Sequence, residues 1–411
     1  MSALVAVGAL LAQTATSVPL QETAEGPKVG QTTYIDLEGA VGYSTNPFLS
    51  FESDDGRGFG RISLHAVHAR TTVRTTTLLS AYASNDTYTG RYGSQQSLSL
   101  NARHDAAVSE HFRIFGDVQA GYDKGGQLDT RILGVPVVRP LPGSPEIPPQ
   151  LLPPGSDFLS LAGKRYWAAA HAGGQLALSP RDSFSFSAGL ERQVARNGPL
   201  PSTSSWTVPA TLAYDRRINE RATAGARVTF SNTNYNGPAN FRTITPQVTG
   251  TLQLSERLNL GGAIGVSFSR IDDGTRITHS TGAAADAYLC SSGEQSELCA
   301  RAAVGQQTAT AIGPAKSVSA GINYTRRLDQ KSSIQASLDG SRYSTPTSIL
   351  SGPIFSRSTY YRAAGSYTRS IGTRLFGGIN LSGRKLTQNG PDPKADFSGS
   401  LFIRYRFGDV Q

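Results

Sequence analysis

The sequence predicts an all-β chain that forms a transmembrane antiparallel up-and-down β-barrel of about sixteen strands, with short periplasmic turns and long external loops. Three observations carry this prediction. Apolar and polar side chains alternate along many segments, the connections fall into a short and a long class, and no apolar run reaches the roughly 18 residues of a transmembrane helix. Only 38% of the residues are hydrophobic and 44 are glycine, which fits strands that have one wet face.

The final strand, at 396–407, gives the plainest alternation. Because a strand sends successive side chains to opposite faces, one face is apolar and ends in Tyr405 and Phe407. The other face is mostly small or polar and carries Arg404 and Arg406. A soluble core rarely accepts two arginines on its inward face, whereas a barrel in lipid has an apolar outside and a wet lumen.

The same period of two recurs along the rest of the chain. It is clear at 35–43, 98–103, 112–122, 184–190, 206–214, 258–268, 318–324 and 375–381. Alternation is weakest at 58–69 and 75–83, so fourteen or eighteen strands also fit the pattern.

The connections between these segments alternate between two kinds. Short turns share a loose motif, as in Leu254-Ser-Glu-Arg-Leu258 and Tyr324-Thr-Arg-Arg-Leu328. Long or variable loops are expected near 44–57, 84–92, 123–163, 196–204, 234–240, 271–315, 344–356 and 386–396. These loops and the short turns between them predict about sixteen strands with both termini on the short-turn side. Four tyrosines near the short turns would form an inner aromatic girdle: Tyr214, Tyr324, Tyr367 and Tyr405.

The N-terminal region predicts export. Residues 1–17 resemble a signal peptide of an atypical kind, because no Lys or Arg precedes Lys28 and the basic n-region is missing. We expect residues 18–31 to form an N-terminal periplasmic segment and residues 32–408 to form the barrel. The expected location is the outer membrane of a Gram-negative bacterium.

The two cysteines, Cys290 and Cys299, lie close together in a polar stretch. In an exported protein such a pair favours a disulfide, here within the expected outer loop 271–315. Free thiols are the alternative, and a metal site would need more ligands than this stretch offers.

The inward face of the expected barrel carries both signs of charge. Parity places these candidates in the lumen: Asp36, Glu38, Arg103, Arg113, Asp117, Arg227, Arg362, Arg384, Arg404 and Arg406. They could hold the wall together as cross-strand ion pairs, or they could create a field that guides a charged solute. At the closing seam, Arg404 and Arg406 should face Asp36 and Glu38, which favours the first reading for these four.

No catalytic, cofactor-binding or metal-binding residue stands out, and the sequence predicts a protein that is not an enzyme. The histidines are scattered and none belongs to a nucleophile motif: His65, His68, His104, His111, His171 and His279. The glycine-rich stretch at 56–60 lacks the following helix that a phosphate loop needs.

At Gly39-Ala-Val-Gly-Tyr-Ser-Thr-Asn-Pro-Phe48 the chain resembles the opening of the β-barrel porin 2 family, in which a first strand ends in Gly-Tyr before an Asn-containing outer loop. The repeated Ser-x-Arg-Leu turns and the aromatic last strand are similar as well, so the resemblance spans roughly residues 32–408. The tail after Phe407, Gly408-Asp-Val-Gln411, departs from the pattern.

The resemblance implies an outer-membrane barrel of the kind often associated with exopolysaccharide synthesis and export. We therefore expect a channel or secretion component for an acidic polysaccharide, without cofactors. The alternatives are a general diffusion porin for small solutes, a lipid- or glycan-modifying barrel enzyme, and a structural barrel closed by the Pro-rich loop. Expected partners are outer-membrane lipid and lipopolysaccharide, the barrel-assembly machinery and polysaccharide export proteins, with no nucleic acid.

Overall fold

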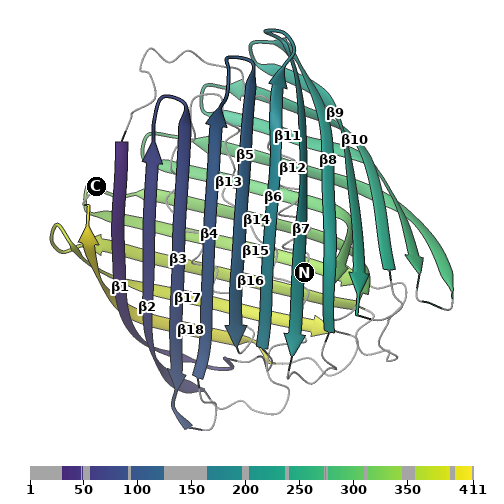
Figure 1. Cartoon of the computed structure of the whole chain (residues 1–411). Coiled ribbons are helices and arrows are strands. Elements are labelled where there is room, and N and C mark those ends of the chain that lie inside the picture. Colours follow the sequence, from purple (N-terminus) through teal and green to yellow (C-terminus); the bar gives the residue numbers. More distant parts are fainter. Residues whose placement is uncertain are drawn as a thin grey trace.

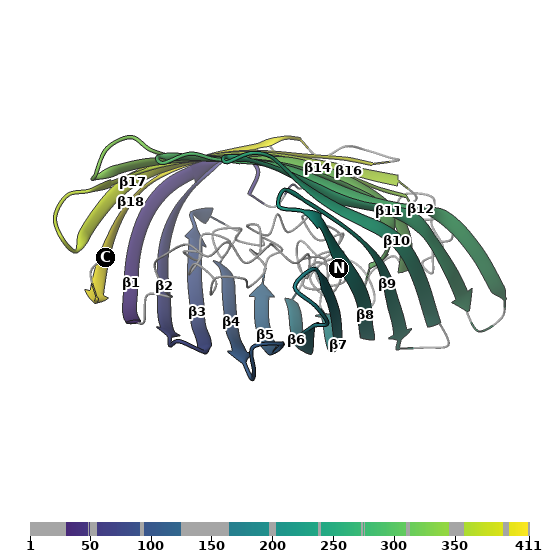
Figure 2. The ribbon, with the colours of Figure 1, turned by 90° about the horizontal axis from the view of Figure 1, so that it is seen from above.

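Eighteen antiparallel strands follow one another around a closed, flattened ring in the computed structural model (Figures 1 and 2). The structure describes residues 30–409 apart from 48, 50–55, 91–93, 125–163, 197–202, 237–239, 273, 275, 310–312, 345–356 and 389–393. The expected signal peptide, nearly all of the expected N-terminal segment and most of the Pro-rich loop lie outside the described residues.

Each strand pairs with its neighbours in sequence. The strands are β1 (Gly30–Ser44), β2 (Arg57–Thr71), β3 (Thr75–Tyr88), β4 (Ser94–Ala107), β5 (Phe112–Lys124), β6 (Lys164–Ala177), β7 (Asp182–Arg196), β8 (Thr203–Asn219), β9 (Ala222–Tyr235), β10 (Asn240–Ser255), β11 (Leu258–Asp272), β12 (Ile277–Ser292), β13 (Ser296–Ala309), β14 (Gly313–Arg327), β15 (Ser332–Ser344), β16 (Arg357–Ser370), β17 (Leu375–Gln388) and β18 (Asp396–Gly408).

The ring closes where β1 meets β18. Their register runs from Tyr34 opposite Gly408 to Ser44 opposite Ser398, and β1 also pairs with β2 on its other side. Every described strand therefore has a partner on both edges. This matters in lipid, because an unpaired strand edge would leave backbone polar groups without hydrogen bonds.

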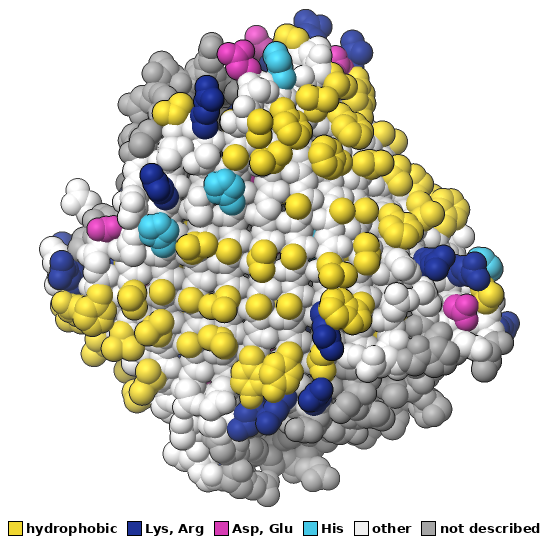
Figure 3. Space-filling view, in the orientation of Figure 1, with side chains coloured by type: hydrophobic (Ala, Val, Ile, Leu, Met, Phe, Trp, Pro, Cys, Tyr) yellow, Lys and Arg dark blue, Asp and Glu magenta, His cyan; other side chains and the backbone are white. Residues whose placement is uncertain are grey.

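The outward face of the barrel is apolar. Val41 and Ile264 are 66% and 69% exposed, whereas their neighbours Ala40 and Ala263, which point the other way, are buried. Apolar side chains run in rows across the face seen in Figure 3, and charged side chains gather toward its edges. Such a belt is stable only against lipid, since water would penalise so large an exposed apolar surface. Among the described residues, no helix is both long and apolar enough to cross a membrane.

The expected count of about sixteen strands is wrong, because the expected loop at 271–315 contains the hairpin of β12 and β13. Alanine occupies the middle of its outward face on β12, at Ala283, Ala285 and Ala287. Ala284 points inward between two of them, so the run of alanines hides the period of two. The weakly alternating segments at 58–69 and 75–83 do form strands, β2 and β3.

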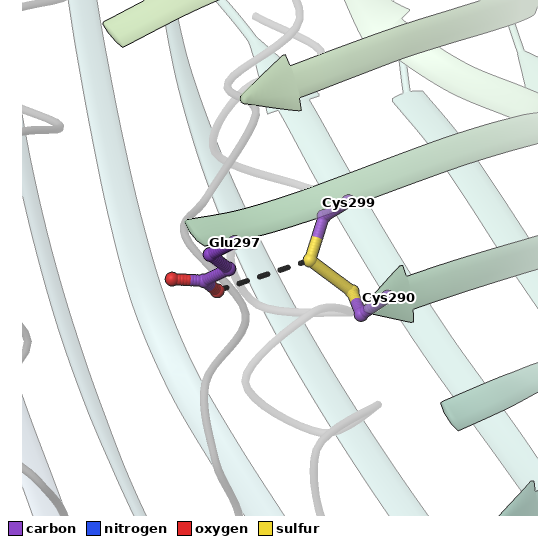
Figure 4. The surroundings of a disulfide bond; sticks show 3 residues. All are labelled: Cys290, Glu297 and Cys299. Atoms are coloured by element: carbon purple, nitrogen blue, oxygen red, sulfur yellow. Dashed lines mark hydrogen bonds between the residues drawn. A yellow bond between two sulfur atoms is a disulfide. The ribbon is translucent and has the colours of Figure 1, made fainter. Parts of the chain in front are cut away.

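Because of this hairpin, the cysteine pair lies at the opposite end of the barrel from the one expected. Cys290 and Cys299 are opposite each other in the β12–β13 ladder and are joined by a disulfide (Figure 4). They flank the short turn 293–295, so the bond lies at the short-turn end and not in an outer loop as expected. Glu297 lies beside it, with Oε1 3.9 Å from Cys299 Sγ.

Candidate functional site: the charged lumen wall

All the sequence-predicted lumen candidates lie on the face opposite the exposed apolar side chains. The strands that carry them are β1, β4, β5, β9, β16, β17 and β18, so the candidates are spread around the barrel wall and do not form one cluster. The ladder register brings some of them together in pairs and leaves others apart.

The closing seam holds the most complete of these pairs. Asp36 is directly opposite Arg406, and both Asp36 oxygens accept hydrogen bonds from its guanidinium, from Nε at 2.7 Å and Nη2 at 2.8 Å. Such a bidentate pair is stronger and more directional than a single hydrogen bond. The Arg406 guanidinium also lies 4.0 Å from the centre of the Tyr34 ring, which fixes it from one side.

Arg404, one step along the same face, is held more loosely. It is opposite Glu38, and its Nε lies 3.4 Å from Glu38 Oε2 while its Nη1 lies 3.9 Å from Asp36 Oδ2. The seam therefore joins two arginines of β18 to two carboxylates of β1, as the sequence pattern indicated.

At the outer end of the same seam, the Asp396 carboxylate accepts four hydrogen bonds. It is 0% exposed and accepts from Ser44 Oγ at 2.6 Å, from the Asn46 backbone N–H at 3.0 Å, and from Nε and Nη2 of Arg384. The Arg384 guanidinium also donates to the Pro47 carbonyl at 3.2 Å. The candidate Arg384 thus joins the first residues after β1 to β17 and β18.

The remaining arginine candidates also have carboxylates nearby. Arg103 donates to both oxygens of Asp105 on its own strand, at 2.8 and 3.0 Å, and Asp105 also acts electrostatically on Arg113. Arg362 is directly opposite Asp339 of β15. Arg61, which parity also places inside, is ion-paired with Asp86 of β3.

Arg227 is the most deeply buried of the set. Its Nη2 donates to Gln247 Oε1 at 2.7 Å and to Asp286 Oδ1 at 3.0 Å, so it links β9 to β10 and to β12. Asp286 lies on the hairpin that the sequence pattern did not reveal, which is why this pair could not be predicted.

A buried histidine between two carboxylates was missed altogether. His171 of β6 contacts Asp117 Oδ2 through Nδ1 and Glu191 Oε1 through Nε2, each at 3.1 Å. Both ring nitrogens can donate at once only when the imidazole is protonated, and an imidazolium between two carboxylates fits this geometry. Gly189 makes room for the ring, because a Cβ there would come within 2.1 Å of His171 Cδ2.

Parity alone could not have found this cluster. It places Asp117 and Glu191 inside, but β5 and β6 are separated by the long connection 125–163, so the register that brings His171 between them is not readable from sequence. Over the part of the chain that the structure describes, no group of three or more ligands could hold a metal ion. The described inward face of the barrel consists of paired charged side chains surrounded by serine and threonine hydroxyls.

A closed antiparallel barrel with an apolar outside, a polar inside, short turns at one end and longer connections at the other belongs in one membrane. The chain is an outer-membrane β-barrel of a Gram-negative bacterium. No family model matches it, and no curated protein does, so the resemblance to the β-barrel porin 2 family stays a prediction.

Solved structures of similar topology exist at very low sequence identity. The FrpB iron transporter from Neisseria meningitidis (F5-1 variant) is 10% identical with a TM-score of 0.46, over 90% of this chain and 65% of that one. OccK2 (OpdF) from Pseudomonas aeruginosa is 11% identical with a TM-score of 0.44, over 93% of this chain and 98% of that one. OpdQ from Pseudomonas aeruginosa is 8% identical with a TM-score of 0.43, over 92% and 98%. This chain thus spans just under two thirds of the FrpB length.

Proposed function

We propose that this protein is a channel through which hydrophilic solutes cross the outer membrane. The observation that carries the proposal is the inward face of the closed barrel, where hydroxyls, carboxylates and guanidinium groups replace the apolar residues of the outward face. Barrels of 16–18 strands are wide enough to leave an aqueous passage. The paired charges of the wall favour polar solutes of either sign over a strongly selected anion.

Export of an acidic polysaccharide is the narrower proposal within this class. It rests on the family resemblance and on the inward arginines, but those arginines have carboxylates beside them, which reduces the net attraction for an anionic chain. Polysaccharide export proteins would be partners under this proposal, and the barrel-assembly machinery would be a partner under any version of it.

Liposome swelling tests the proposal. Folded protein reconstituted in liposomes should admit neutral oligosaccharides, and the swelling rate should fall as the oligosaccharide lengthens. Liposomes with heat-unfolded protein are the control. Swelling no faster than in that control would reject a channel for hydrophilic solutes.

Uronic-acid oligomers of matched length distinguish the narrower proposal. Faster entry of the acidic oligomers than of the neutral ones would favour an acidic polysaccharide, and equal entry would favour a general diffusion porin.

A further inference from the structure

Three basic side chains lie side by side on the lipid-facing wall near its outer end. Arg242 of β10 is directly opposite Arg270 of β11, and Arg270 is directly opposite His279 of β12. All three are exposed and point outward, on the same faces as Ile244 and Phe268. We refer to Arg242, Arg270 and His279 as the outer basic row. Neighbouring strands are about 4.8 Å apart, so the row spans roughly 10 Å.

Among the described residues, the outer basic row has no acidic partner. None of its three side chains makes an ion pair or a hydrogen bond with another residue that the structure describes. On this face Asp272 lies one outward position beyond Arg270 on β11, and its Oδ1 accepts from the Gly274 backbone N–H. Like charges directly opposite each other in a ladder are destabilising. An anion from outside the chain would therefore relieve the repulsion between Arg242 and Arg270.

The height of the row on the wall indicates what that anion is. The next outward residues toward the membrane centre, Ile244 and Phe268, are paired with each other and exposed, followed by Val248 and Ile264. Trp206 of β8, also outward, is aligned through β9 with Asn240, one outward position beyond Arg242, and the Arg192 guanidinium lies 4.8 Å from its ring centre. Tryptophan and arginine favour the boundary between hydrocarbon and headgroups. The row thus lies where lipid phosphates would be, at the end of the barrel that carries the longer connections.

We propose that the outer basic row binds the phosphate groups of lipopolysaccharide in the outer leaflet. Two guanidinium groups side by side present parallel N–H donors to phosphate oxygens, and His279 adds a third donor. Binding depends on the outer-membrane location and not on whether the lumen conducts, so it stands apart from the proposed channel.

The test uses the whole folded protein in detergent and follows the temperature at which the compact gel band of the barrel is lost. Lipid A carrying its phosphates should raise that temperature, whereas dephosphorylated lipid A and inorganic phosphate alone should not. An equal rise with dephosphorylated lipid A would overturn the proposal, because the acyl chains alone would explain it. An equal rise with inorganic phosphate would also overturn it, because the row would then be a simple anion site.

Variants assign the effect to the row. Arg242→Gln with Arg270→Gln should weaken the apparent affinity for phosphorylated lipid A about 30-fold, as expected for two arginines at a lipid surface. The matched control is Arg326→Gln with Arg369→Gln, which removes two exposed, outward-facing arginines at the short-turn end. The control should bind like the wild type. Full binding by the row variant, or equal loss in both variants, would reject the assignment.

Discussion

Arg406 shows what a single inward charge does in this barrel. Its guanidinium contacts both oxygens of Asp36 across the closing seam, so removing it leaves a nearly buried carboxylate without its main partner. Arg406→Gln should lower the free energy of unfolding by about 1.5–3 kcal/mol, the range for hydrogen bonds to charged groups. The melting temperature of the compact gel band measures this.

Arg404→Gln is the matched control, because Arg404 is on the same face of β18 but its contacts with Glu38 and Asp36 are 3.4 and 3.9 Å. It should destabilise the barrel less than Arg406→Gln. If instead Arg406→Gln changed ion selectivity and left the melting temperature unchanged, the arginine would guide solutes and the seam interpretation would be wrong.

Gly189 provides a second test at the residue scale. An alanine Cβ at this position would approach His171 Cδ2 to 2.1 Å and the Ala170 carbonyl oxygen to 2.9 Å. Gly189→Ala should therefore destabilise the barrel by about 1–3 kcal/mol, as overpacking does. The same substitution made together with His171→Ala should cost clearly less, because the ring is gone. Equal costs in the two backgrounds, measured by urea unfolding in detergent, would show that the ring does not need this space.

At this scale the sequence pattern predicted which face each charge occupies but not which charges meet. Parity placed Asp117, Arg384 and Arg406 on the inward face because a strand alternates strictly. Partners depend on register, and register depends on connections whose geometry the residues do not reveal. The seam pairs were an exception, since the first and last strands must close on each other.

At the scale of elements, the β12–β13 hairpin is the feature that the sequence pattern did not reveal. Alternation is visible when large apolar residues face lipid, as along β11, but alanine contributes too little contrast on β12. The short turn Gly293-Glu294-Gln295 that joins the two strands is the remaining signal, and it lies within the stretch that the sequence pattern assigns to a loop.

The disulfide of this hairpin closes a loop with a sequence separation of 9 and should restrict the unfolded chain. Replacing both Cys290 and Cys299 with serine should lower the free energy of unfolding by about 2–3 kcal/mol. Urea unfolding of the folded barrel, with the wild type measured in the presence and absence of reductant, checks this. The reduced wild type should match the double variant. Identical stability of oxidised, reduced and variant protein would contradict a constraining role.

At the scale of the whole molecule, the fold class could be predicted because lipid contacts one side of the barrel wall and water contacts the other. Lipid outside and water inside impose opposite demands on alternate residues of every strand, so the class was readable even where individual strands were not. Sorting of the connections into short and long also predicted that the first strand starts and the last strand ends on the short-turn side. The number of strands could not be predicted, because a count of eighteen includes the two strands of the β12–β13 hairpin, which the sequence pattern does not reveal.

This closed barrel has a hydrophilic lumen with paired charges, and we propose that the lumen conducts ions. Recording single channels in planar bilayers with a KCl gradient tests this proposal. Because the described inward arginines have carboxylates beside them, the protein should give discrete conductance steps with a reversal potential near zero. A compact, heat-modifiable protein that gives no steps would contradict the claim of a channel. Strong selectivity for chloride would contradict the claim that the wall charges are paired.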